Sequence, residues 1–333
     1  MTMNRKWVCF ALALLLSSSA QQTPVKNDRP ETYAFAEIGG RPLKLDLFRS
    51  KEEPPSPLLI WIHGGAWMSG SRAQIPEALR RLPAEGVSVA SLDYRLTSQD
   101  GRWGEEPVHW PAQRDDCKAA VRWLRANAKE LNVDPEAFVV WGASAGGHLA
   151  ATLGLTNDAP GTLGEVGEHA EISSAVSLAI DFYGPTELFL MNQDVTEPPG
   201  SVIDHDAHDS PESLVLGAKV HGHSLAEIRA HMNDPKEPWP ALVALARSAS
   251  PVHALAAEHA CPLFLAHGKR DKLIAFAQGQ RLHRRMQSLH LKSTWRPVEG
   301  AGHGFREDIY LEAIAWMKEH LKRDPEHTPE ATD

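Results

Sequence analysis

The sequence Phe138-Val-Val-Trp-Gly-Ala-Ser-Ala-Gly-Gly-His-Leu-Ala-Ala151 decides how this chain folds. Its first four residues are apolar, β-branched or aromatic, and they predict a buried β-strand. Its second half consists of residues that a helix accepts, and this part continues through Thr152 and Leu153. We therefore expect a strand, a very short turn and a helix, with the turn centred on Ser144.

The five residues from Gly142 to Gly146 fit the pattern G-x-S-x-G. In that pattern a serine occupies a sharp strand-to-helix turn, and the glycines are needed because a side chain there would collide with neighbouring backbone. The turn exposes the Ser144 Oγ, and the helix start behind it offers free N–H groups and the positive end of a dipole. Ser144 is therefore a candidate nucleophile, and the alternative is a small-residue turn that only joins a strand to a helix.

The composition is that of an ordinary globular protein. The 333 residues are 42% hydrophobic and 23% charged, with a net charge of −9. A chain of this length can bury roughly three quarters of its unfolded surface, which suffices for one large domain or two ordinary ones. Because no basic stripe occurs, we expect no nucleic acid and no anionic membrane surface as partner.

The first 20 residues have the pattern of a secretory signal peptide. Arg5 and Lys6 precede an apolar run, residues 7–16, that is too short to span a bilayer. Small residues at 18–20 suit cleavage, and residues 21–32 then form a polar leader. We expect export to the periplasm or the medium, with no membrane insertion after cleavage, and a buried N-terminal helix is the alternative.

Export leaves two cysteines in the mature chain. Cys117 lies in an expected amphipathic helix, and Cys261 lies just before an expected strand. A disulfide between them and a pair of buried free thiols are both compatible with the sequence.

Strand-like apolar runs alternate with helix-like segments along most of the chain. Runs at 33–38 and 43–48 predict a hairpin, and the continuous apolar run 58–62 predicts a strand covered on both faces. The further expected strands are 87–92, 138–141, 175–180, 263–266 and 294–298, and the expected helices are 73–82, 112–131, the one after Ser144, and 309–321. This alternation predicts an α/β fold with a mostly parallel central sheet flanked by helices.

Residues 186–250 interrupt the alternation after the sixth expected strand. The segment is rich in acids, histidines and prolines and has one helical patch at 224–232. We expect a cap-like insertion over the active face of a domain that spans 33–322, with a polar tail at 323–333. A lipase lid needs a large apolar face, so this polar insertion favours a water-soluble substrate.

Two later residues can activate Ser144. A serine hydroxyl needs a base, usually a histidine held by a buried carboxylate, and one common chain order is serine, acid, histidine. Asp271 follows the seventh expected strand, and His303 follows the eighth. Because the carboxyl ends of parallel strands share one edge, we expect these residues to form a triad with Ser144. Asp181, after the sixth strand, is the alternative acid.

The loop after the third expected strand reads His63-Gly-Gly-Ala-Trp67. A tetrahedral oxyanion needs two or three N–H donors, and a glycine-rich loop can turn its N–H groups toward the nucleophile. The start of the helix after Ser144 adds another donor, the N–H of Ala145. A plain glycine turn is the alternative. The expected oxyanion hole consists of Gly64, Gly65, Ala66 and Ala145.

Several blocks of the sequence together resemble the α/β-hydrolase esterases. These blocks are His63 to Trp67, Asp93-Tyr-Arg-Leu96, Gly142 to His148, Asp181-Phe-Tyr-Gly-Pro185, Ser250-Pro251, His267 to Asp271 and Gly302-His-Gly-Phe305. They are most similar to the bifunctional feruloyl/acetylxylan esterase-like (BD-FAE-like) branch, beside the hormone-sensitive-lipase-like carboxylesterases. The resemblance covers residues 33–322 and implies an α/β-hydrolase fold.

The resemblance also implies roles for individual residues. Ser144 would be the nucleophile, Asp271 the acid and His303 the base. One departure is visible after the acid, where Leu273-Ile274 stands in place of the Val-Pro that these families often have. The departure weakens the local match but leaves the identity of the acid unchanged.

For the oxyanion hole, the resemblance implies donors at Gly65, Ala66 and Ala145, while Gly64 shapes the loop. Ala66 replaces the third glycine of the lipase-type HGGG pattern and still has an N–H to donate. Members of these families commonly remove acetyl or other small acyl groups from carbohydrates.

Other residues are candidates for binding. A tryptophan can stack on a sugar ring, although it more often packs in the core or at its rim. The run Asp204-His-Asp-Ala-His-Asp209 has metal-ligand residue types, but so dense a run is usually a solvated loop, and we expect no bound metal. The candidate substrate contacts are Trp67, Trp103, Trp110 and Trp239.

These patterns favour an exported serine carboxylesterase that acts without a cofactor through an acyl-enzyme. The expected substrates are small-molecule or oligosaccharide esters with short acyl groups, such as acetylated or feruloylated carbohydrates. Two alternatives stand beside it: an amidase or formamidase on the same triad, and a non-catalytic binding protein with the same fold. The sequence leaves the oligomeric state open.

Overall fold

The computed structural model describes residues 29–52, 55–195 and 203–322. The expected signal peptide, most of the expected leader and the tail at 323–333 lie outside the described residues. Residues 31 and 32, expected in the leader, already belong to the first strand. Among the described residues, no helix combines the length and the apolar character needed to cross a membrane.

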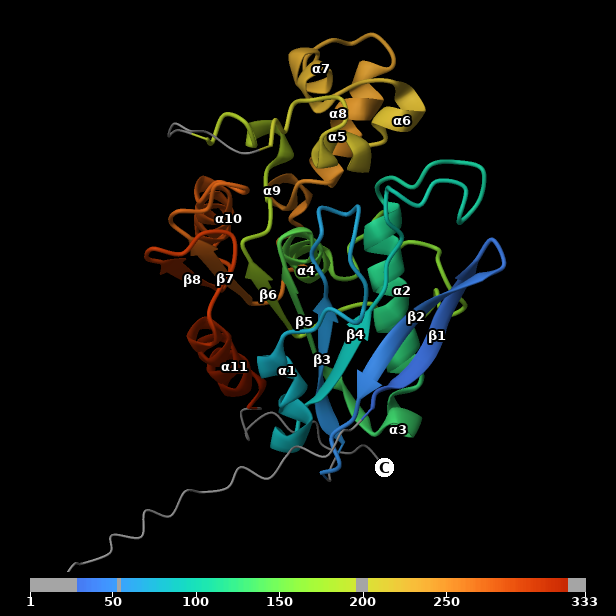
Figure 1. Ribbon diagram of the computed structural model, residues 1–333, viewed down its shortest axis with the longest axis vertical. Coiled ribbons are helices and arrows are strands. Elements are labelled where there is room, and N and C mark those ends of the chain that lie inside the picture. The colour runs from blue at the N-terminus through green and yellow to red at the C-terminus, as the bar shows by residue number, and fades with distance from the viewer. Residues whose placement is uncertain (1–28, 53–54, 196–202, 323–333) are drawn as a thin grey trace, which may run out of the picture.

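The described residues form one eight-stranded sheet in the order β1-β2-β4-β3-β5-β6-β7-β8 (Figure 1). The strands are β1 (Glu31–Ile38), β2 (Arg41–Phe48), β3 (Ser56–Ile62), β4 (Ser88–Leu92), β5 (Val133–Ala143), β6 (Leu178–Phe182), β7 (Leu263–Gly268) and β8 (Ser293–Val298). Strand β2 runs antiparallel to both neighbours, and every pairing from β4 across to β8 is parallel. The predicted mostly parallel sheet is confirmed.

Helices cover both faces of the sheet, as Figure 1 shows. One face packs against α2 (Ala112–Ala126), α4 (Ala145–Thr156) and α10 (Ala277–Ser288). The other face packs against α1 (Glu77–Arg80) and α11 (Glu307–Leu321). The sheet therefore lies between two helical layers, each with its own apolar core.

Strand β3 shows how the sequence specifies a sheet that lies between two helical layers. Leu58, Ile60 and Ile62 belong to the core shared with α2 and α4. Leu59 and Trp61, which alternate with them, belong to the opposite core. Successive side chains of a strand point to opposite faces, so a strand between two helical layers needs a continuous apolar sequence.

The helix expected at 73–82 is shorter than predicted. Pro76 sets the start of α1, and a 3-10 turn, η1 (Leu82–Glu85), follows it with Pro83 in its first turn. A proline has no N–H to donate within a helix, so the two prolines confine α1 to one turn. The apolar spacing alone does not reveal this limit.

Two further helices differ from the prediction. The helix expected at 112–131 divides at Asn127 into α2 and α3 (Ala128–Leu131), where the Asn127 side chain donates to the carbonyl of Trp123 (2.8 Å) and competes with the helical pattern. Helix α10 is not predicted because its sequence is mostly polar. Its buried positions, which include Leu282 and Met286, form only a narrow strip.

The described parts of 186–250, residues 186–195 and 203–250, form a helical insertion between β6 and β7. The insertion contains η2 (Leu188–Leu190), α5 (Pro211–Val215), α6 (Ala218–His221), α7 (Leu225–Ala230) and α8 (Trp239–Ser248), and α9 (Pro251–Ala254) follows it. Figure 1 shows α5 to α8 gathered beyond the carboxyl ends of the strands. Leu216, Leu225 and Ile228 are buried in the same core as α2 and α4, so the insertion packs as part of the domain.

Both described cysteines are buried free thiols. Burial raises the pKa of Cys261 to about 12 and raises the pKa of Cys117 well above its usual value. A thiol that does not ionise is a poor nucleophile and a poor metal ligand. Of the two interpretations of the cysteines, the structure supports the free thiols.

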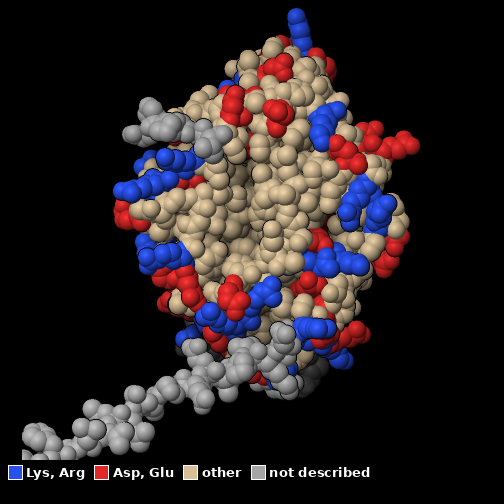
Figure 2. All heavy atoms as spheres, viewed as in Figure 1, with Lys and Arg blue, Asp and Glu red and all other residues tan. Residues whose placement is uncertain are grey.

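Charged side chains lie mainly around the margin of the face drawn in Figure 2. Lysines, arginines, aspartates and glutamates alternate there, and the broad central area carries uncharged residues. On this face, charged side chains of both signs are thus spread along the margin and are not gathered in one patch.

A substitution behind the serine turn tests its close packing. A Cβ on Gly142 would lie 2.0 Å from Gly146 O, at the start of the helix behind Ser144. We expect Gly142→Ala to lower the free energy of unfolding by roughly 1–3 kcal/mol or more, as overpacking does, measured by urea denaturation. Gly302→Ala is the matched control, since its Cβ would meet only Arg270 O at 3.8 Å. Equal losses in both variants would contradict the close contact.

Candidate active site

Ser144 lies between the end of β5 and the start of α4, on the turn predicted from the sequence. Its backbone has φ 58° and ψ −125°, which residues with a side chain rarely adopt. The neighbouring glycines allow this turn to approach β3, since a Cβ on Gly146 would lie 2.1 Å from Ile62 O. The Ser144 N–H donates to Phe182 O (2.9 Å), which ties the turn to β6.

His303 and Asp271 approach Ser144 from two loops at the same edge of the sheet. Asp271 follows β7, and His303 follows β8. His303 Nε2 lies 2.9 Å from Ser144 Oγ, and His303 Nδ1 lies 2.7 Å from Asp271 Oδ2. The geometry allows the hydroxyl to donate to Nε2 while Nδ1–H donates to the carboxylate. The structure thus brings together the three residues that the sequence order predicts.

The buried carboxylate of Asp271 is held in its charged form. Its side chain has no exposed surface, whereas 18% of the His303 side chain is exposed. Burial would raise the pKa of Asp271, but hydrogen bonds from His267 and His303 outweigh it and hold the pKa well below its usual range. Asp271 Oδ1 also accepts the N–H groups of Leu273 (2.9 Å) and Ile274 (3.0 Å). This carboxylate can therefore stabilise a positive charge on His303.

The loop after β3 passes directly over the serine turn. A Cβ on Gly64 would lie 2.8 Å from Ala143 O and 3.3 Å from Ser144 Cβ. Any larger residue at position 64 would push the loop away from the nucleophile. Glycine at this position therefore sets the distance between the loop and Ser144.

The expected oxyanion donors lie in this loop and at the start of α4. Gly65 (φ 113°) and Ala66 (φ 55°) both have positive φ values. Within the described part of the chain, no protein acceptor receives the N–H groups of Gly65 and Ala66. Ala145 is the first residue of α4, where an N–H has no partner within the helix. Unpaired donors around a nucleophile are what an oxyanion hole requires.

His63 and Tyr94 brace the base of the loop at residues 63–67, which we call the oxyanion loop. Their rings stack with centroids 4.4 Å apart and an interplanar angle of 15°. Tyr94 Oη donates to His63 O (3.1 Å), and His63 Nδ1 donates to Gly64 O (2.7 Å). Burial lowers the pKa of His63, which keeps the ring neutral at pH 7. The loop is therefore fixed by contacts that need no substrate.

His148 joins the oxyanion loop to the insertion. Its Nδ1 accepts Trp67 Nε1–H (3.2 Å), and its Nε2–H donates to Ala249 O (2.7 Å). Burial lowers the pKa of His148 to about 4, so the neutral ring that these two bonds require is the form present at pH 7. The sequence places His148 in the serine motif but gives no signal for this role, because its partners are 81 and 101 positions away.

Tyr183 is a second residue that the sequence does not identify as part of the site. Its ring centroid lies 4.7 Å from that of His303 and 4.8 Å from that of Phe305. Its backbone has φ 46°, which is uncommon for a bulky residue and is typical of functional sites. Tyr183 therefore forms an aromatic wall that limits how the His303 ring can turn.

Trp67 and Trp110, two of the expected substrate contacts, are core residues. Trp67 is 1% exposed, Trp110 is 0% exposed, and both rings pack against His148 at 5.1 and 5.4 Å. Trp110 Nε1 donates to Ser248 Oγ (3.0 Å). The expectation of sugar stacking is wrong for these two residues, because neither ring has a free face.

Trp103 and Trp239 are half-buried in the structure. Trp103 Nε1 donates to Gln99 Oε1 (2.7 Å). Trp239 begins α8, and its ring lies parallel to that of His231 with centroids 3.8 Å apart. Contact between either tryptophan and a substrate stays a prediction.

Asp181, the alternative acid, bonds to a different partner. Its Oδ1 accepts the Gly184 N–H (2.8 Å). That oxygen lies against α4, since a Cβ on Gly147 would be 2.3 Å from it. Burial raises the pKa of Asp181 to about 6, the opposite of the shift at Asp271. The geometry therefore places Asp271, and not Asp181, beside His303.

The run at 204–209 makes contacts within the insertion. Asp204 Oδ1 accepts Asn192 Nδ2–H (2.7 Å), and Asp206 forms an ion pair with Arg229 (2.6 Å). Among the described residues, no three or more histidine, cysteine, aspartate or glutamate side chains are grouped so that they could hold a metal ion.

The fold and the site together define an α/β-hydrolase. In this fold the turn that carries Ser144 and the loops that carry Asp271 and His303 lie at one edge of the sheet. A truncated carbohydrate esterase from gut microbiota has a TM-score of 0.70 at 22% identity, over 90% of this chain and 99% of that one. Est2 of Thermogutta terrifontis, solved with propionate bound, has a TM-score of 0.62 at 25% identity, over 88% and 93% of the two chains. The expected fold is confirmed.

The chain belongs to the BD-FAE family, whose model matches residues 45–286. Esterase LipC of Mycobacterium tuberculosis is 32% identical over 266 residues, which are 78% of this chain and 56% of LipC. Esterase LipQ of the same organism is 28% identical over 246 residues, which are 73% of this chain and 49% of LipQ. The chain thus spans about half the length of the curated relatives it matches. The match to the family model confirms the resemblance drawn from the sequence.

Asp271→Asn tests the buried carboxylate. The amide keeps the shape of the side chain but favours the wrong tautomer of His303, a change that lowers kcat roughly 10⁴-fold in other Ser–His–Asp sites. We expect covalent labelling of Ser144 by a fluorophosphonate probe to slow by on the order of 100-fold or more. Ser144→Ala gives the background, and labelling of the Asn variant at the wild-type rate would contradict the assignment.

Asp181 makes stability depend on pH. Its folded pKa of about 6 lies above its ordinary value of 3.8, so the folded state binds the extra proton and stability falls as pH rises from about 4 to 6. We expect Asp181→Asn to gain about 2 kcal/mol relative to wild type between pH 4 and pH 7, measured by urea unfolding. Exposed Asp308→Asn is the control. A difference between Asp181→Asn and wild type that does not change with pH would count against the buried titration.

Proposed function

We propose that this protein is a serine carboxylesterase that hydrolyses short acyl esters through an acyl-enzyme. The observation that carries the proposal is the hydrogen-bonded chain from Ser144 through His303 to Asp271, next to the N–H groups of the oxyanion loop. A nucleophile, its base and oxyanion donors at one place are the parts that acyl transfer needs. Membership of the BD-FAE family and the similarity to Esterase LipC support an ester as the acyl donor.

In the first half-reaction, Ser144 Oγ attacks the ester carbonyl while His303 Nε2 takes the hydroxyl proton. The charge of Asp271 stabilises the resulting imidazolium. The carbonyl oxygen becomes an oxyanion that accepts the N–H groups of the oxyanion loop and of Ala145, and such a donor is worth about 3–4 kcal/mol in the transition state. The intermediate then expels the alcohol, which receives the proton from His303, and the acyl group stays on Ser144.

The second half-reaction reverses these roles with water as the nucleophile. His303 takes a proton from the water, whose oxygen attacks the acyl carbon. The same N–H groups receive the second oxyanion, and Ser144 leaves with the proton that His303 returns. The products are the free acid and the regenerated serine, so both steps use one set of protein groups.

We propose a small or oligomeric carbohydrate ester, acetylated or feruloylated, as the substrate. One similar structure is a carbohydrate esterase, and another was solved with propionate, a short acyl group. Among the described residues, the exposed large hydrophobic side chains are Leu163, Val220 and Leu311, and of these only Val220 lies in the insertion. An insertion without an apolar outer patch fits a water-soluble substrate better than a lipid surface.

We also propose that the protein is exported through an N-terminal signal peptide. The positive start, the short apolar run and the small residues of positions 1–20 support it. A carbohydrate ester outside the cell is a substrate that an exported enzyme can reach. Export also disfavours the formamidase alternative, whose substrate would be a small intracellular amide.

Ser144→Ala tests the proposed reaction. We expect turnover of p-nitrophenyl acetate to fall by roughly 10⁶-fold, as removal of the nucleophile does in other serine hydrolases, with an unchanged melting temperature. Ser288→Ala, on the exposed side of α10, is the matched control and keeps wild-type turnover. Full activity of the Ser144 variant would overturn the proposal.

A panel of substrates, assayed with the wild-type protein, identifies which acyl group and which alcohol the enzyme prefers. Nitrophenyl esters of rising chain length, methyl ferulate and acetyl-xylan separate the acyl group from the alcohol. We expect kcat/KM to fall as the acyl chain lengthens. Faster turnover of a formyl amide than of any ester would favour the amidase alternative.

A further inference from the structure

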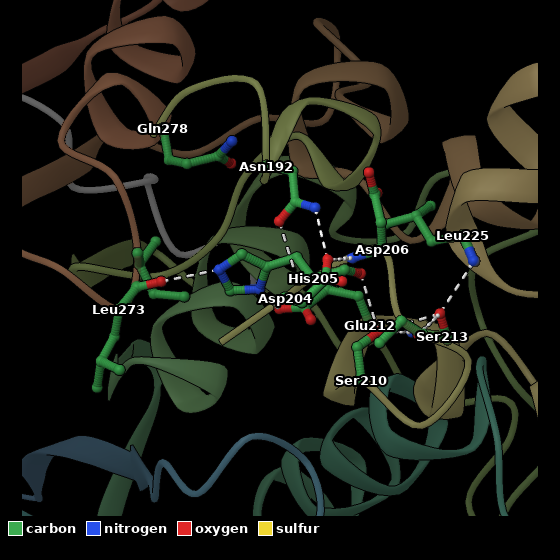
Figure 3. Close-up of polar contacts among 12 residues, drawn as sticks. Asn192, Asp204, His205, Asp206, Ser210, Glu212, Ser213, Leu225, Leu273 and Gln278 are labelled. Atoms are coloured by element: carbon green, nitrogen blue, oxygen red, sulfur yellow. Dashed lines mark hydrogen bonds and ion pairs between the residues drawn. The ribbon is translucent and has the colours of Figure 1, made fainter. Parts of the chain in front are cut away.

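A buried histidine–carboxylate pair lies inside the insertion and is not part of the triad. His205 Nδ1 is 3.0 Å from Glu212 Oε1, and the two side chains are only 1% and 2% exposed. Figure 3 shows the pair between the loop that carries Asp204 and the helix that carries Glu212. The proposed reaction does not use either residue. A buried ionisable pair is expensive to desolvate, so its retention calls for a physical explanation.

The other ring nitrogen of His205 contacts the loop of the catalytic acid. His205 Nε2 donates to Leu273 O (3.0 Å), a bond that Figure 3 draws across the gap between the insertion and that loop. Leu273 is also one of the two residues whose N–H groups hold Asp271 Oδ1. The backbone of Leu273 is therefore held on both sides: its N–H by the acid and its carbonyl by the insertion.

Ile274, the next residue, is held in a parallel way. Its N–H donates to Asp271 Oδ1 (3.0 Å), and its carbonyl accepts His267 Nε2–H (2.9 Å). His267 belongs to β7, so this second bond comes from the sheet. We call residues 271–274 the acid loop. Two buried histidines thus hold the acid loop by its carbonyls, His267 from the sheet and His205 from the insertion.

The position of His205 is itself fixed by its neighbours. Its N–H donates to Asn192 Oδ1 (2.9 Å), and its carbonyl accepts Ser210 Oγ–H (2.9 Å). Asn192 in turn donates to Asp204 (2.7 Å), as Figure 3 shows. The imidazole therefore approaches Leu273 from a rigid base, which is what a residue needs in order to set the position of another.

The two ring contacts favour the doubly protonated, charged form of His205. Burial lowers the pKa of His205, but the hydrogen bond and the charge of Glu212 raise it by more, so the net shift is upward. The bond to Leu273 O and the charge of Asp206 add to this effect. The charged imidazole is paired with a carboxylate on one side (3.0 Å) and donates to a carbonyl on the other (3.0 Å), and a charge on the donor strengthens the second bond.

We propose that His205 is a positioning residue for the catalytic acid: by holding Leu273 O, it keeps the acid loop where Asp271 meets His303. The proposal rests on the ester hydrolysis proposed above. In this role His205 acts through the backbone of Leu273 and not on the reacting atoms. Its removal lets the acid loop move, and a displacement of about 1 Å near a catalytic group can lower the rate about 100-fold.

Two substitutions separate the two contacts of His205. A glutamine places its amide nitrogen near the position of the lost Nε2 and keeps a donor for Leu273 O. An asparagine is one carbon shorter, so its amide replaces Nδ1 toward Glu212 and does not reach Leu273. Both variants remove the imidazole and its charge, and they differ in the single bond that the proposal invokes.

We expect His205→Asn to lower kcat for p-nitrophenyl acetate by about 10- to 100-fold with little change in KM, while His205→Gln stays within about 3-fold of wild type. His221→Asn is the matched control, because His221 Nε2 donates to Leu216 O (2.9 Å) inside the insertion and has no bond to the acid loop. Melting temperatures report folding. His205→Ser also lacks the donor and replaces His205→Asn where that variant does not fold.

A second readout needs no substrate. The proton shared by His303 Nδ1 and Asp271 gives a low-field ¹H NMR signal, which we expect to move or broaden in His205→Asn and to stay in place in His205→Gln. Equal losses of kcat in both variants, or an unchanged kcat and signal in His205→Asn, overturn the positioning role. Absence of ester turnover in the wild type overturns the proposed function instead, and the NMR signal still decides the role of His205.

Discussion

The site depends on a backbone conformation that ordinary residues avoid. Ser144 has φ 58°, and a conformation of this kind costs about 1–3 kcal/mol, so the surrounding structure must enforce it. That enforcement comes from close approach: the serine turn lies against the end of β3, where Gly146 leaves no room for a Cβ, and the oxyanion loop passes over it at Gly64. A looser fit would let the turn relax and would withdraw the Ser144 hydroxyl from His303.

A second constraint is the fully buried charge of Asp271. In a low-dielectric interior an unpaired carboxylate would take up a proton and could no longer stabilise an imidazolium. The protein prevents this with the N–H groups of Leu273 and Ile274 on Oδ1 and the ring of His303 on Oδ2, while His267 of β7 lies 3.5 Å from Oδ2. Two of these donors belong to the acid loop itself, so the charge of the acid depends on the shape of that loop.

The sequence predicts the parts of this site that follow from strand order. Ser144, Asp271 and His303 each follow a separate strand, and parallel strands bring their carboxyl ends to one edge, so chain order alone predicts their meeting. His148 and His205 could not be predicted, because their contacts depend on how the insertion packs across 101 and 68 positions of the chain. Trp67 and Trp110 were expected at the substrate but are buried, because a residue type alone does not reveal which face a segment buries. Helix α10 was not predicted, because a mostly polar helix gives little apolar signal.

The insertion is attached to both halves of the active site, and this limits how it can contribute to catalysis. On the oxyanion side, Ala249 O accepts a bond from His148, which also holds Trp67. On the acid side, His205 donates to Leu273 O. A lid that opened as a unit would break both attachments and would release the donors and the acid together. The described part of the insertion is therefore better understood as a fixed wall of the site than as a lid that opens as a unit.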